Sequence, residues 1–127
     1  NSDRRIKTDI SEIQNSFEII NNLHPVRFKY SDSYRKMHPE IEDRFYYNFI
    51  AQEYREVFPE SVQGSGEFLE DEPGEILQMD SYNAQIVTIQ AVKELIKKNK
   101  DLEQRLNEQE ALIQELLKMN QNKEDDF

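Results

Sequence analysis

The chain has no cysteine, and its 127 residues include only three glycines and four prolines. The absence of cysteine excludes disulfides and thiolate metal sites, although it does not identify a compartment. No segment has the pattern of a signal peptide, and no apolar run is long enough to span a bilayer. We therefore expect no membrane partner.

Apolar residues are also scarce. Hydrophobic residues make up 36% of the chain and charged residues 33%, which is little apolar material for one self-sufficient domain. We therefore expect other subunits to supply part of the core. The net charge of −10 argues against nucleic acid or an anionic membrane as the main partner.

The first 80 residues predict an α+β head made of small pieces. Residues 10–23 predict a helix, since apolar side chains recur there every three or four positions and Ser11 with Gln14 suggests a capping box. Residues 26–30 alternate between apolar and basic side chains, as a half-buried strand does. The polar segment 31–44 predicts an irregular surface excursion.

The rest of the head alternates between strand and turn signals. Residues 45–51 are rich in aromatics and predict a strand, and residues 52–58 predict a short helix that ends before Pro59. Residues 64–74 contain all three glycines and several acids, which predicts an exposed loop. Residues 76–80 predict a last short strand.

Residues 81–120 predict one long helix with a coiled-coil heptad pattern, followed by a disordered tail over 121–127. With Val92 at position a, the core positions keep an unbroken spacing of three and four residues over about four heptads. The core positions are Val92, Leu95, Asn99, Leu102, Leu106, Gln109, Ile113, Leu116 and Asn120.

The flanking positions of this helix favour a parallel homotrimer. Lys98 at g would face Glu103 at e of a neighbour, and Arg105 would face Glu110. Apolar g and e residues widen the seam toward the C-terminus, which three strands bury more easily than two. The polar core layers either set register and subunit number or hold an ion or water between amides, and we favour the first interpretation.

The remaining polar clusters do not predict a cofactor or metal site. His24 and His38 each precede a proline and have no partner at metal-ligand spacing. The acids of the 64–75 region do not follow the calcium-loop pattern. Residues 45–47 could form an aromatic binding platform, but strand propensity and packing explain them more simply.

Ser2 and Lys7 form a potential nucleophile and base five residues apart. A random pair of this kind would be a frayed terminus and a solvated side chain, and a lysine in water, with a pKa near ~10.4, is a poor base at neutral pH. Burial can make its amine neutral, and a neutral amine can activate a serine. An oxyanion stabiliser is also required, and a backbone N–H in an oligomer is our default expectation.

These two residues begin a series of motifs that extends along most of the chain. The motifs are Ser2–Arg5 with Lys7–Ile10, Asn48–Glu53 with Val57–Glu60, Met79–Tyr82, and Ala91–Leu95. In order and spacing they resemble the C-terminal intramolecular chaperone domain of phage endosialidases, tailspikes and tail fibres, the S74 peptidase family. The sequence departs from the family at Asn48, where the family has glycine, and at Tyr54, where it has valine.

The resemblance implies a single-turnover serine endopeptidase acting in cis. Ser2 and Lys7 would be catalytic, Asn1–Ser2 would be the cleavage site, and the start of the chain would be a cleavage scar or nearly so. Gln52 and Glu53 are candidate supporting residues, although capping of the following helix explains them equally well. The chain would trimerise, assist folding of an upstream fibre or spike segment of the same precursor, and then release itself.

Two other functions remain open at this point. One is a structural trimerisation module that stays attached and does not cleave. The other is the related self-cleaving domain of membrane-tethered transcription factors. In the viral case, the domain would act in the host cytoplasm during virion assembly and be released from the mature fibre.

Overall fold

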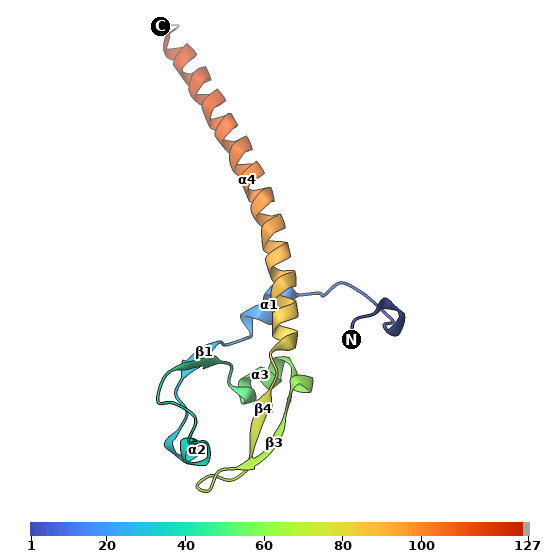
Figure 1. The fold of residues 1–127 in the computed structure, drawn as a ribbon. Coiled ribbons are helices and arrows are strands. Elements are labelled where there is room, and N and C mark those ends of the chain that lie inside the picture. Colours follow the sequence, from blue (N-terminus) through green and yellow to red (C-terminus); the bar gives the residue numbers. More distant parts are fainter. Residues whose placement is uncertain (126–127) are drawn as a thin grey trace. The chain divides into compact units, whose positions relative to one another are not determined.

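The computed structural model describes residues 1–125, and the chain divides into two compact units, Asn1–Gln90 and Ala91–Phe127. Figure 1 shows the small mixed head and the long C-terminal helix. The α+β class predicted from the sequence is therefore confirmed.

The first helix, α1, spans only Ser16–Asn21. The predicted helix over 10–23 is wrong in extent because Asn15 has a positive φ of 58° and Asp9 one of 53°. A left-handed residue cannot continue a right-handed helix. The predicted capping box does not form, since the Gln14 amide instead donates to the carbonyl of Glu12 at 3.5 Å.

Two short strands follow and pair antiparallel. Strand β1, Val26–Phe28, faces β2, Tyr46–Asn48, with Arg27 opposite Tyr47. Both strands are shorter than the predicted segments 26–30 and 45–51. Between them the predicted irregular segment contains a helix, α2, over Asp32–Met37. Ser31 caps it by accepting a hydrogen bond from the Tyr34 N–H at 3.2 Å, a start signal that the sequence reading missed.

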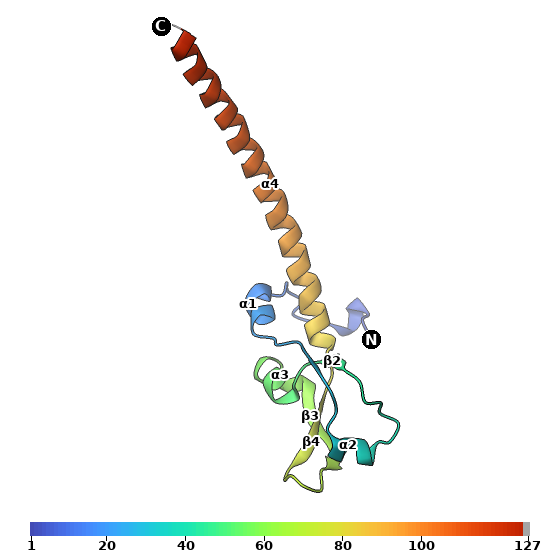
Figure 2. The ribbon, with the colours of Figure 1, turned by 90° about the vertical axis from the view of Figure 1, so that its left-hand side faces the viewer.

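The helix expected before Pro59 is present as α3, Ala51–Val57, and a short 3-10 helix, η2, covers Pro59–Ser61. The predicted exposed loop over 64–74 is wrong for residues 64–68, which belong to a strand. Strand β3, Val62–Phe68, pairs with β4, Glu75–Met79, to form the hairpin seen in Figures 1 and 2. The chain turns only between these strands, where Gly74 has a φ of +99° that favours glycine.

The core of the head forms where α3 meets the first turns of α4, the long helix Tyr82–Asp125. Tyr54, Phe58, Ala84 and Val87 are buried against one another. The half-buried side chains packed around them come from α1, α3, the strands and the connecting segments: Ile13, Ile19, Ile20, Leu23, Phe49, Val57, Val62 and Met79. This packing holds α1, α3 and the hairpin together.

In the second unit, α4 continues without a break through Asp125. The predicted disordered tail over 121–127 is therefore wrong for residues 121–125, where no glycine or proline ends the helix. Residues 126 and 127 of that tail lie outside the described residues. None of the helices within residues 1–125 has the length and apolar character needed to cross a membrane.

The apolar core positions of the heptads have no cover in the single chain. Val92, Leu95, Leu102, Leu106, Ile113 and Leu116 are each about half exposed or more. A helix with such an uncovered apolar seam is stable when further helices bury it.

Candidate functional site

Residues 1–12, here called the N-terminal arm, contain one short 3-10 helix, η1, over Arg4–Ile6. Asp3 caps it, because its carboxylate accepts a hydrogen bond from the Arg5 N–H at 2.8 Å. The same carboxylate binds the Arg5 guanidinium at 2.7 Å. These contacts with Arg5 hold the pKa of Asp3 below its ordinary value. The arm thus has a defined turn at its start.

Ser2 and Lys7 lie at the two ends of this turn. Ser2 directly precedes the capping Asp3, and the Lys7 backbone N–H donates to the Arg4 carbonyl at 3.2 Å. Both residues are exposed, and within residues 1–125 no hydrogen bond joins their side chains. The local fold therefore keeps the two residues near one turn, without the contact that a nucleophile and its base require.

The two acids beside Lys7 have other partners. Asp3 binds Arg5, and the Asp9 carboxylate accepts a hydrogen bond from the Thr8 hydroxyl at 3.2 Å. Among the described residues, no ion pair involves Lys7, and its side chain is exposed. The candidate site therefore lacks a cover that excludes water.

Gln52 and Glu53 lie in the first turn of α3, away from the arm in sequence and in their contacts. The Glu53 carboxylate contacts Nδ1 of His24 at 2.8 Å, which ties the segment before β1 to α3. Gln52 lines a cleft in the head. Within the described residues, neither side chain has a hydrogen bond to Ser2 or Lys7. The sequence reading missed His24 as a partner, because nothing local to it points to an acid 29 positions away.

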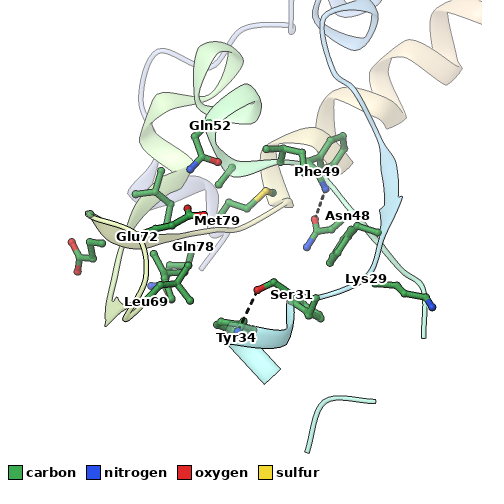
Figure 3. Close-up of a pocket in the computed structure, with 18 of the residues that line it drawn as sticks. Lys29, Ser31, Tyr34, Asn48, Phe49, Gln52, Leu69, Glu72, Gln78 and Met79 are labelled. Atoms are coloured by element: carbon green, nitrogen blue, oxygen red, sulfur yellow. Dashed lines mark hydrogen bonds between the residues drawn. The ribbon is translucent and has the colours of Figure 1, made fainter. Parts of the chain in front are cut away.

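The cleft lies between the β1–α2 segment and the β3–β4 hairpin and has a volume of about 580 Å³. Figure 3 shows Lys29 and Leu69 on opposite sides of it. An aromatic cluster supports its wall, with the Tyr30 ring 5.1 Å from Phe28 and 5.3 Å from Tyr34. Burial raises the pKa of Tyr34, and the nearby Glu67 adds to this effect. The phenol of Tyr34 is thus kept neutral.

Two polar contacts fasten α2 to the hairpin. The Ser33 hydroxyl donates to Asp71 at 2.8 Å, and Nε2 of His38 contacts Glu67 at 3.0 Å while its Nδ1 contacts Glu40 at 3.3 Å. Ser33 with Asp71 and His38 with Glu67 therefore hold the two sides of the cleft together. In the part of the chain that the structure describes, no group of three or more suitable side chains could hold a metal ion.

Comparison with known proteins places these features in one class. A solved structure described as the crystal structure of a novel intramolecular chaperone has the same fold, with a TM-score of 0.50 and 19% identity. The similarity covers 76% of this chain and 99% of that one. A search of the curated proteins found no match. The two chains therefore share a fold.

Residues 2–63 match the family model Peptidase S74, described as chaperone of endosialidase. The match to this family model confirms the resemblance seen in the sequence. The matched segment begins at Ser2 and includes Lys7, Gln52 and Glu53. It ends within β3, so most of the hairpin and all of α4 lie beyond it.

Proposed function

We propose that this domain is a self-cleaving intramolecular chaperone. It trimerises, assists the folding of an upstream fibre or tailspike segment, and then detaches by cutting before Ser2. The observation that carries the proposal is the family match over residues 2–63, which contains both Ser2 and Lys7 at the ends of one capped turn.

The proposed reaction uses Ser2 as nucleophile and Lys7 as base. Neutral Lys7 takes the proton of the Ser2 hydroxyl, and the Ser2 oxygen attacks the carbonyl carbon of Asn1. The C–N bond of the Asn1–Ser2 peptide then breaks, and the Ser2 nitrogen leaves as an amine that takes the proton back. The resulting ester joins the Asn1 carbonyl to the Ser2 oxygen. Water hydrolyses it to a carboxylate and a free serine hydroxyl.

Trimerisation would use the apolar seam of α4, whose core positions are uncovered in the single chain. Opposite charges at g and e, Lys98 with Glu103 and Arg105 with Glu110, favour parallel strands in register. Holding three upstream chains together reduces the entropic cost of forming contacts between distant segments. After release, the upstream protein would be trapped kinetically in its folded form.

The place of action follows from this role. A domain that assists the folding of a viral fibre and is then removed would work in the host cytoplasm during virion assembly. It would be absent from the mature fibre.

The proposal is tested with a precursor that carries the native residues upstream of Asn1. Wild type, Ser2→Ala and Lys7→Ala are compared on a denaturing gel after refolding. We expect wild type to yield two fragments and both variants to stay at full length. Ser11→Ala and Lys36→Ala serve as controls, since both replace exposed residues of the same types outside the dyad.

One observation favours a second function, a trimerisation module that stays attached. Ser2 and Lys7 are exposed and do not contact each other through their side chains within residues 1–125. On the same gel, an uncut wild type that is nevertheless trimeric would favour this module and contradict the protease. Cleavage that persists in Ser2→Ala would contradict the assignment of the nucleophile.

A further inference from the structure

The first turns of α4 have two apolar faces. One face carries Ala84 and Val87, which are 5% and 6% exposed because the core of the head covers them. The other carries Tyr82, Ile86 and Ile89, here called the outer stripe, which are 62%, 39% and 60% exposed. The outer stripe is therefore an apolar surface without a partner in its own chain.

The N-terminal arm has the complementary property. Its two isoleucines, Ile6 and Ile10, are 64% and 61% exposed. Among the residues that the structure describes, the arm makes only local hydrogen bonds, to partners within three positions along the chain. Figure 1 shows the start of the arm, in dark blue, as a segment apart from the core of the head. Within one chain, the arm and the outer stripe therefore do not cover each other.

The heptad pattern indicates which copy can cover the outer stripe. Counting back along α4 from Val92 at position a places Ala84 at g and both Tyr82 and Ile89 at e. In a parallel coiled coil, the g positions of one helix face the e positions of the next. Because each head covers the g side of its own helix, it lies beside the e side of its neighbour. The arm is part of that head.

We propose that the arm of one copy packs Ile6 and Ile10 against the outer stripe of a neighbouring copy. Lys7 lies between these isoleucines in sequence, so the same contact removes Lys7 from water and favours its neutral amine. The dyad is then complete only in the assembled trimer. This inference rests on the proposed function, and it names the surface that covers the site.

The contact is tested by chemical cross-linking, which the chain suits because it has no cysteine of its own. An Ile10→Cys chain and a size-tagged Ile89→Cys chain are mixed unfolded, refolded together and treated with a short bis-maleimide. We expect a band that contains one chain of each kind. Each variant alone should give at most a trace of linked chains.

The matched control replaces Ile89→Cys by a size-tagged Lys97→Cys chain. Lys97 is exposed at heptad position f, which points away from neighbouring helices in a coiled coil. We expect at least a tenfold weaker mixed band with this control.

The outcomes separate the inference from the proposed function. A mixed sample that is trimeric by light scattering but gives no Ile10–Ile89 band, or no more than the Lys97 control, overturns the inference and leaves the trimer standing. A mixed sample that stays monomeric overturns both. A mixed band in a trimeric sample supports the inference whether or not the precursor is cut.

Discussion

Tyr54 shows how one residue can organise the head. It is 1% exposed, and its ring packs 5.0 Å from Phe49 and 5.4 Å from Phe58. Among the described residues, its hydroxyl has no hydrogen bond of good geometry, although the Ala84 backbone lies close enough to influence it. From the sequence alone, Tyr54 was only a departure from the family's valine. Its role as the central core residue became visible in the structure.

Burial raises the pKa of Tyr54 above its ordinary value of 10.0, and the backbone of Ala84 opposes this effect in part. The folded state therefore favours the protonated phenol. This contribution to stability is complete below the pKa of the unfolded chain and is lost as the pH rises through the folded pKa. We predict that stability falls at strongly alkaline pH and that Tyr54→Phe reduces this fall.

The measurement is urea unfolding as a function of pH. At neutral pH we expect Tyr54→Phe to change the unfolding free energy by about 1 kcal/mol or less, because the lost hydroxyl has no well-made hydrogen bond. Tyr47→Phe is the matched control, since Tyr47 is exposed on β2. A variant with Phe at 54 that keeps the full alkaline fall would contradict the assignment. We attribute any alkaline loss of stability that remains in Tyr54→Phe to Tyr34, whose pKa is also raised by burial.

At the scale of elements, the heptad pattern of α4 predicts that other helices bury its apolar seam. Leu106 occupies position a and is 63% exposed in the single chain. Its contribution to stability therefore depends on whether other helices cover it. A buried leucine and an exposed one respond very differently to truncation.

We predict that Leu106→Ala destabilises the trimer by about 2–5 kcal/mol per chain, as expected for a leucine in a packed core. Gln104→Ala, at the outward position f, should change stability by about 0.5 kcal/mol or less. Thermal unfolding at several protein concentrations measures both effects. Equal, small effects of the two substitutions would show that α4 does not pack through this seam.

The elements of the head illustrate what sequence patterns can and cannot indicate. Helix α3 was predicted from its own residues and the following Pro59, and strand β4 from its own apolar residues, because these signals act locally. The helix predicted over 10–23 is present only as α1, because the left-handed backbone at Asn15 interrupts an apolar periodicity that extends through it. The hairpin was missed because β3 pairs through its backbone with β4, and its composition looks like that of a loop.

At the scale of the whole molecule, assembly and cleavage are coupled in our proposal. The candidate site lies on an exposed arm. In the proposal, the helix that would trimerise would also supply the surface that covers this site. A chain that cannot trimerise should therefore keep its Lys7 in water and its precursor intact.

We predict that Leu106→Asp combined with Ile113→Asp yields a monomer. Its precursor should be cut at least about tenfold more slowly, because assistance by a general base accelerates such reactions by about 10²–10⁴-fold. The control combines Gln104→Asp with Gln114→Asp, which adds the same charge at outward positions. Gel analysis of the precursor and light scattering are performed on the same samples. A monomer that is cut as fast as wild type would show that cleavage does not depend on assembly.

The sequence by itself determined the resemblance to the family, the class of fold and the long heptad helix. These follow from short motifs and from regular spacing, which depend on residues close together in the chain. It also identified Ser2 and Lys7 as candidates, which remains a prediction. The sequence also identified Gln52 and Glu53 as candidates, but it did not predict the contacts that they make.

Only the tertiary structure decided which residues meet across the chain. Examples are the contact of His24 with Glu53, the contact of His38 with Glu67, and the packing of Tyr54 against the first turns of α4. In each case, the sequence around one residue gives no indication of its partner. The structure likewise showed that the arm and the outer stripe remain uncovered. Burial depends on all parts of a molecule at once, so spacing along the sequence cannot supply it.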